Sequence, residues 1–199
     1  MRQKLLYTII IFLFLSINSF AKNLKFTKII VLDKPWGSSF INNNELIISE
    51  KSGKIKIVNI ENSDNNEIDH NLNFLESGQG GLLDIIYKDG FVWISYTEDR
   101  GNLKTSTSIA KGKFNRKKIF FKNIFQANPP IDSSYHFGSR LAIKDNYIFA
   151  SLGERGQGMI AQDFSSHPGS IIRIHLDGTI PIDNPKFKKK KIGYQKFIR

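Results

Sequence analysis

The stretch GSRLAIKDNYIFASLGE at residues 138–154 contains the pattern that decides the fold. A glycine opens a short apolar run, Asp145 and Asn146 interrupt it, and a second run of β-branched and aromatic residues ends at Glu154. Asp and Asn at such an interruption favour a tight turn between antiparallel strands, because both residues tolerate the left-handed backbone that the turn needs. The stretch therefore predicts a β-hairpin with its turn at residues 145–146.

The same pattern occurs twice more upstream. First strands are predicted at WGSSFI from Trp36 and at GLLDIIY from Gly81, and second strands at ELIISE and FVWISYTE, with polar turns at 43–44 and 89–90. The second strands end at Glu50, Glu98 and Glu154, which are 48 and 56 residues apart. Third strands are predicted at KIKIVNI, TSIAKGKF and SIIRIHL, with IFFKNIF available as a fourth. Strand, turn, strand, loop and strand in a unit of about fifty residues is typical of β-propeller blades.

The fold class follows from this repeat. No segment after residue 21 shows sustained helical periodicity, and the β-branched and aromatic content suits pleated, half-buried surfaces. A glycine recurs at each first strand, which favours a propeller because its inner strands crowd toward the axis. The sequence predicts an all-β chain with about three propeller blades. A β-sandwich made of the same strands is the alternative.

The amino terminus is typical of a secretory signal peptide over residues 1–21. Two basic residues precede an apolar run, and the segment closes with the small-residue ending Ser19-Phe20-Ala21. The run is shorter than the ~20 residues that span a bilayer, so an uncleaved anchor is the alternative. We expect a periplasmic or secreted domain over residues 22–185, without stable membrane insertion after cleavage.

The carboxyl terminus differs in composition. Residues 186–199 read KFKKKKIGYQKFIR, a basic tail that contains four consecutive lysines. Such a run suggests an adenine-rich stretch where a reading frame could slip, so we expect a truncated or frameshifted gene product. A short protein that ends in a solvated basic tail is the alternative.

Cysteine content and charge bear on how the fold is stabilised and on which partners the chain could bind. The chain has no cysteine, so an exported domain must rely on packing instead of disulfides. Its formal net charge is +11, but the lysines are scattered along strand-like segments. Export and this scatter argue against nucleic acid as a partner.

Few residues match known motifs for metal binding or catalysis. The sequence contains no H-E-x-x-H, paired cysteines or close histidine pair, so no metal site is predicted. His70, His167 and His175 occur singly and are expected on the surface or with satisfied ring nitrogens. No phosphate-binding loop and no G-x-S-x-G nucleophile motif occurs either.

Two polar residues occupy equivalent places in the repeat. Gln79 lies two residues before Gly81, and His136 lies two residues before Gly138. Inner strands of a propeller begin around one mouth of the central channel, so both side chains are expected to converge there. The alternatives are structural: Gln79 bonds backbone in a glycine turn, and His136 is held between its aromatic neighbours.

At these residues the chain resembles the soluble quinoprotein sugar dehydrogenases, which comprise glucose and sorbosone dehydrogenases and aldose sugar dehydrogenases. KPWGSSFI, GQGGLLDI, ISYTE, HFGSRL, SLGERG and AQDFSSHPGSIIRIHLDGTIPIDNP follow the family's motifs in order, over roughly residues 26–185. The resemblance implies a six-bladed β-propeller that binds pyrroloquinoline quinone (PQQ), with calcium beside the quinone. Family chains continue for about as long again, and their G-H-R-N motif and calcium ligands are expected in that later part.

The resemblance also implies roles for three residues. His136 takes the proton from the C1 hydroxyl of the sugar while hydride passes to the quinone carbon, Gln79 hydrogen-bonds the cofactor, and Gln162 is a weaker candidate for the same shell. The implied function is a periplasmic PQQ-dependent oxidoreductase acting on aldose sugars and passing electrons to an external acceptor, with this chain an incomplete copy. The alternative is a non-catalytic periplasmic propeller that binds a sugar or a protein.

Overall fold

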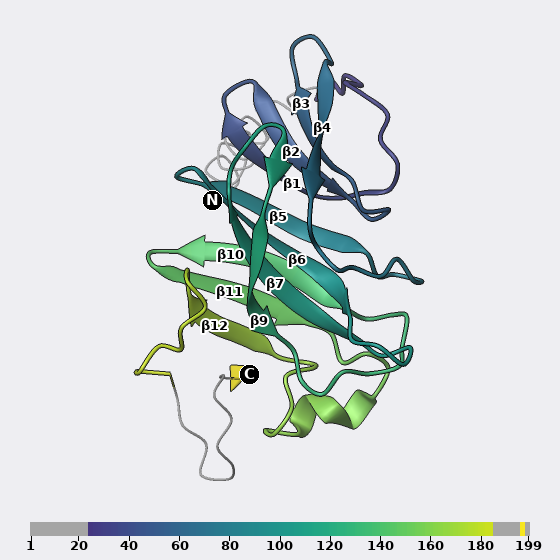
Figure 1. Ribbon diagram of the computed structural model, residues 1–199, viewed down its shortest axis with the longest axis vertical. Coiled ribbons are helices and arrows are strands. Elements are labelled where there is room, and N and C mark those ends of the chain that lie inside the picture. The colour runs from purple at the N-terminus through teal and green to yellow at the C-terminus, as the bar shows by residue number, and fades with distance from the viewer. Residues whose placement is uncertain (1–23, 185–195, 198–199) are drawn as a thin grey trace, which may run out of the picture.

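The computed structural model describes residues 24–184 and 196–197, which form three β-sheets that we call blades I, II and III (Figure 1). Blade I contains β1 (Pro35–Asn42), β2 (Glu45–Glu50), β3 (Ile55–Asn59), β4 (Asn65–His70) and the short β8 (Lys118–Ile119). Blade II contains β5 (Leu82–Lys88), β6 (Phe91–Asp99), β7 (Thr105–Lys113) and β9 (Phe121–Gln126). Blade III contains β10 (Gly138–Lys144), β11 (Tyr147–Leu152), β12 (Ile171–His175) and β13 (Lys196–Phe197), with a 3-10 helix, η1 (Gly158–Gln162), before β12.

The three predicted hairpins are present as β1–β2, β5–β6 and β10–β11, all antiparallel. The prediction of an all-β fold with about three propeller blades is therefore confirmed. The predicted signal peptide lies outside the described residues, as does nearly all of the predicted basic tail.

The predicted fourth strand IFFKNIF is divided between two blades. Ile119 pairs with β4 of blade I in parallel, whereas Phe121 begins β9 and pairs with β7 of blade II. The Asn71 side chain bonds both backbone groups of Phe121, accepting from its N–H at 2.7 Å and donating to its carbonyl at 3.1 Å. Asn71 thus fixes the point where the chain leaves one sheet for the next.

Two apolar clusters hold the blades together, and blade II contributes to both. Successive side chains of a strand point to opposite faces, so Ile94 packs toward blade I and Trp93 toward blade III. Burial on both faces explains why β6 has an almost unbroken run of buried residues.

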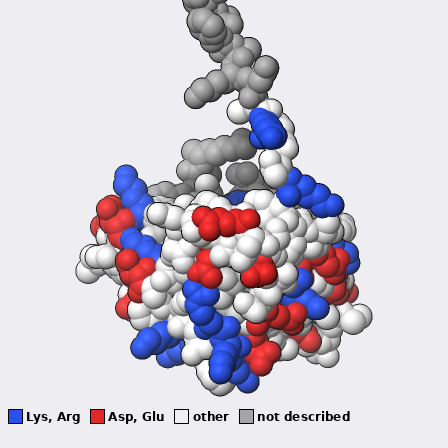
Figure 2. All heavy atoms as spheres, turned by 90° about the horizontal axis from the view of Figure 1, so that it is seen from above, with Lys and Arg blue, Asp and Glu red and all other residues white. Residues whose placement is uncertain are grey.

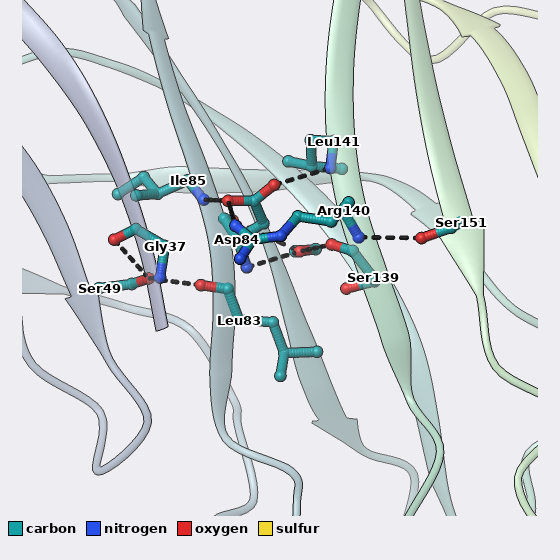
Figure 3. Close-up of polar contacts among 10 residues, drawn as sticks. Gly37, Ser49, Leu83, Asp84, Ile85, Ser139, Arg140, Leu141 and Ser151 are labelled. Atoms are coloured by element: carbon teal, nitrogen blue, oxygen red, sulfur yellow. Dashed lines mark hydrogen bonds and ion pairs between the residues drawn. The ribbon is translucent and has the colours of Figure 1, made fainter. Parts of the chain in front are cut away.

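Each first strand carries a bulge, and a serine of the second strand bonds the backbone there (Figure 3). A bulge leaves a backbone group without its ladder partner. The serine hydroxyls accept these N–H groups at 3.0–3.1 Å; the pairs are Gly37 with Ser49, Asp84 with Ser95, and Arg140 with Ser151.

Two of these serines also reach the next blade. Ser49 Oγ donates to the carbonyl of Leu83, and Ser95 Oγ donates to the carbonyl of Ser139 at 2.9 Å. In both cases the acceptor precedes the bulge N–H of the following blade. One hydroxyl thus satisfies a backbone group in its own blade and another in the next.

Asp84 adds a charged contact between blades II and III at the same level (Figure 3). Its carboxylate accepts from the Leu141 N–H at 2.8 Å and from Arg140 Nη1 at 3.0 Å. On its other side Asp84 touches blade I, where a Cβ added to Gly37 would lie 2.7 Å from Asp84 Cα. The recurring first-strand glycine is therefore required in blade I by the approach of the neighbouring blade.

Replacing Ser95 with alanine should destabilise the fold. Ser95→Ala leaves the Asp84 N–H and the Ser139 carbonyl unsatisfied in a buried place, each at a cost of about 1–3 kcal/mol. Denaturant unfolding monitored by circular dichroism measures the change. Ser38→Ala, at an exposed position of β1, should stay within about 0.5 kcal/mol of the parent chain. Equal effects of the two substitutions would contradict the proposed contact.

Basic and acidic side chains are interspersed on the face shown in Figure 2. One pair joins sequence-distant segments: Arg116 donates two parallel hydrogen bonds to the Glu45 carboxylate, at 2.8 and 2.6 Å. This bonding lowers the pKa of Glu45 to about 2. The contact ties the β1–β2 hairpin to the loop between β7 and β8.

Acid should weaken the fold through Glu45. Its pKa is lower in the folded chain than the usual 4.5, so its stabilising contribution is complete above pH 4.5 and is lost as the pH falls toward 2. The pair is solvent-exposed, so the contribution should be at most about 1 kcal/mol. Unfolding free energies measured from pH 6 to pH 2 should fall more steeply in the parent chain than in Glu45→Gln. Parallel curves would show that the ion pair contributes nothing.

Candidate active site

The loops that precede β5 and β10 lie side by side. The Gln79 N–H donates to the Ser134 carbonyl at 2.8 Å, which joins the two loops directly. Gly78 adopts a φ of +54°, and a Cβ there would lie 2.4 Å from the Ser134 oxygen. The glycine before Gln79 is thus needed for this close approach.

The structure brings Gln79 and His136 together. The backbone N–H of His136 donates to Gln79 Oε1 at 2.9 Å, and both residues are exposed. The structural reading of Gln79 therefore holds for its amide oxygen, which bonds backbone. Its amide nitrogen remains as a donor toward a ligand.

Glu154 orients the His136 ring. The ring Nδ1 lies 2.5 Å from Glu154 Oε1, and the same carboxylate oxygen accepts the Gly156 N–H at 3.1 Å. These hydrogen bonds, the one from His136 foremost, hold the pKa of Glu154 below its usual range. When Nδ1 donates to the carboxylate, the neutral ring keeps the lone pair of Nε2 free to accept a proton. Tyr135 packs edge-on against the ring, with centroids 4.9 Å apart.

Sequence reasoning placed Glu154 in the repeat but did not identify it as the partner of His136. The available signal was the hairpin itself, because pairing of β10 with β11 returns the chain to the level where β10 begins. A Cβ on Gly153 would lie 1.9 Å from the His136 carbonyl oxygen, so this glycine lets the two loops meet.

Repeat position alone would not have identified the partner, because the equivalent glutamates have other roles. Glu50 is fully buried and pairs with Lys56 at 3.0 Å. Glu98 accepts hydrogen bonds from neutral groups, those of Ser108, Asn123 and Gln126. Glu154 is the member of the set that contacts a histidine.

The remaining candidates lie apart from this cluster. Gln162 is the last residue of η1 and is exposed, so its role toward a cofactor stays a prediction. His70 bonds backbone with both ring nitrogens, accepting the Leu72 N–H at Nδ1 and lying 2.7 Å from the Gly53 carbonyl at Nε2. His167 accepts the Asn128 N–H at Nδ1. Within residues 24–184 and 196–197, no group of three or more His, Asp or Glu residues could hold a metal ion.

The family model described as Glucose / Sorbosone dehydrogenase matches residues 32–196. The chain belongs to this family. Aldose sugar dehydrogenase YliI of Escherichia coli K12 is 30% identical over 168 residues, covering 79% of this chain and 45% of that protein. Quinoprotein glucose dehydrogenase B of Acinetobacter calcoaceticus is 26% identical over 204 residues, covering 84% of this chain and 43% of that protein.

Solved structures agree on the fold. The soluble aldose sugar dehydrogenase of E. coli in its apo form matches with a TM-score of 0.75 and 29% identity, over 82% of this chain and 50% of that chain. The PQQ-bound aldose sugar dehydrogenase of Streptomyces coelicolor matches with a TM-score of 0.70 at 24% identity, which supports the fold alone. This member of the glucose/sorbosone dehydrogenase family spans about half the length of these relatives.

Removing the His136 ring should change the titration of Glu154. In the parent chain Glu154 should titrate below its usual value of 4.5, because the hydrogen bond from His136 favours the carboxylate. In His136→Asn the midpoint should rise toward 4.5. The side-chain carboxyl ¹³C shift followed by NMR from pH 7 to pH 2 reports this midpoint.

His175→Asn is the matched control for this titration. His175 lies in the same blade, but its ring stacks on Tyr147 and has no hydrogen bond to Glu154. This variant should leave the Glu154 midpoint unchanged. An unchanged midpoint in His136→Asn as well would mean that the short contact with His136 does not form in solution.

Proposed function

We propose that this protein takes part in the oxidation of aldose sugars at C1 by PQQ-dependent chemistry. The observation that carries the proposal is the His136 ring, oriented by Glu154 and exposed beside Gln79. A hydroxyl substrate loses a proton and a hydride when it becomes a carbonyl, so the site needs a base and a hydride acceptor. His136 supplies the base.

The proton moves to Nε2 of His136. With Nδ1 donating to Glu154, a neutral imidazole has a lone pair at Nε2 that can take a hydroxyl proton. Glu154 contacts Nδ1 and stabilises the imidazolium that forms, because opposite charges in contact favour the charged ring. The Tyr135 ring restricts the imidazole from the side.

The residues present fit one edge of a quinone cofactor. The Gln79 oxygen accepts from His136, which leaves the amide N–H₂ as the group that can donate to a ligand, and a quinone carbonyl is an acceptor that suits it. When bound, PQQ would supply the hydride acceptor that no side chain provides. Calcium and an external electron acceptor are further parts of the proposal and rest on the family resemblance.

We also propose that the protein acts in the periplasm or outside the cell. The support is the signal-like sequence of residues 1–21. Within the described part of the chain, no helix is long and apolar enough to cross a bilayer.

The test of the base uses a chimera in which residues 24–184 replace the matching half of the E. coli aldose sugar dehydrogenase. Supplied with PQQ and calcium, it should oxidise an aldose with an artificial dye as electron acceptor. His136→Asn should lower kcat by roughly 10²- to 10⁴-fold while PQQ binding is kept, because asparagine cannot accept the proton. Retained turnover in this variant would show that another group is the base. A chain that binds an aldose but neither binds PQQ nor turns over would favour the non-catalytic module.

The cofactor role of Gln79 is tested by binding. Gln79→Ala should weaken PQQ binding by about 0.5–1.5 kcal/mol, the contribution of a neutral hydrogen bond. Fluorescence titration of the same chimera measures the affinity, and Gln162→Ala measured in parallel tests the weaker candidate. Unchanged affinity in Gln79→Ala would assign the residue only its structural contact with His136.

A further inference from the structure

Arg155, which directly follows Glu154, is a buried cation beneath the His136 loop. Its residue is only 3% exposed, and burial lowers its pKa to about 10. The guanidinium lies 3.6 Å from the centroid of the Phe137 ring, which comes one residue after His136. A charged group in such a place is costly unless its donors are well used.

The hydrogen bonds that Arg155 donates go to backbone or hydroxyl oxygens. Nε donates to the Tyr135 carbonyl at 3.1 Å, and Nη2 donates to the Ser133 carbonyl. Nη1 and Nη2 also bond the carbonyl and hydroxyl of Thr105, at 3.3 and 2.7 Å. No carboxylate among the described residues forms an ion pair with Arg155.

These bonds connect the segment that contains Glu154 and Arg155 with the His136 loop and with β7. Ser133 and Tyr135 precede His136 in its loop, whereas Thr105 begins β7 of blade II, the blade that also carries Gln79. The backbone N–H of Arg155 donates to the His136 carbonyl at 3.3 Å. A planar guanidinium can hold several acceptors in fixed directions at once, which neither a lysine nor an apolar side chain can do.

We propose that Arg155 is a positioning residue that sets His136 against both Gln79 and Glu154. It fixes the loop on either side of the histidine to blade II, so that the His136 N–H meets Gln79 and the ring meets Glu154. The role as an aid to proton transfer rests on the proposed function. The positioning itself is a property of the chain and can be tested without PQQ or sugar.

The test is Arg155→Met in the full chain, which keeps an unbranched apolar stem but removes the guanidinium and all its donors. We expect amide hydrogen exchange at His136 to become at least about tenfold faster, because its N–H is protected only while Gln79 stays in place. The His136 ring signals in ¹H–¹⁵N spectra should also shift as the contact with Glu154 loosens. Circular dichroism confirms that the variant is folded under the same conditions.

Arg173→Met is the matched control. Arg173 lies in the same blade, stacks over the Tyr147 ring at 4.2 Å and bonds Asp183, outside the His136 loop. Loss of Arg173 should lower overall stability. The His136 amide should still exchange at an unchanged rate relative to other amides of blade III, and the His136 ring signals should not shift. Equal changes of His136 exchange and ring signals in both variants would mean that Arg155 has only a general structural role, and would overturn the proposal. Unchanged His136 exchange and ring signals in Arg155→Met would also overturn it.

Thr105→Val keeps the proposal falsifiable if Arg155→Met does not fold. It deletes the hydroxyl that accepts from Arg155 Nη2 at 2.7 Å and that also lies 3.3 and 3.4 Å from the Ile131 and Ser133 carbonyls, with little change of shape. His136 exchange should quicken severalfold, and an unchanged rate would overturn the proposal. Faster exchange at His136 together with full turnover of His136→Asn in the chimera would retain the positioning and reject the catalytic role.

Discussion

The bulge at the start of each blade leaves a backbone N–H without a ladder partner, and a serine hydroxyl of the second strand bonds it. Serine suits this place because its hydroxyl accepts and donates at once. The donated bond goes to the next blade, from Ser49 to Leu83 and from Ser95 to Ser139. Apolar packing between the sheets could tolerate small sliding, whereas these directed bonds specify one register. The relative placement of the blades therefore depends on them.

The geometry of the candidate active site depends on that register between blades. Gln79 and His136 lie shortly before β5 and β10, the two strands that the Ser95 contact joins. A shift of one residue between the blades would separate the His136 N–H from Gln79 Oε1 and leave Gly78 opposite a residue other than Ser134. The contact between Gln79 and His136 thus depends on contacts made between the strands of the two blades.

The parts of the fold that sequence could predict are those set by local chemistry. Polar turns such as Asp145–Asn146 define the hairpins, and the glycines beside Gln79 mark the close approach of two loops. The division of IFFKNIF could not be predicted, because it depends on Asn71, some fifty residues earlier. The partnership of His136 with Glu154 could not be predicted from repeat position alone, because the equivalent Glu50 and Glu98 have other partners. Arg155 gave no signal, since a lone arginine after a strand is usually solvated.

The site lies across the interface of blades II and III, and both blades are within this chain. The groups that orient His136 come from Gln79, Glu154 and the Arg155 contacts, all within residues 79–155. The orientation of the base therefore does not require the part of the relatives that this chain does not match. The cofactor binding that we propose is different, because a quinone would have to be contacted on several sides and Gln79 offers a donor on one. Under the proposed function, the orientation of the base depends on residues 79–155, whereas cofactor binding also involves the part of the relatives that this chain does not match, so the orientation of His136 can be studied in this chain alone.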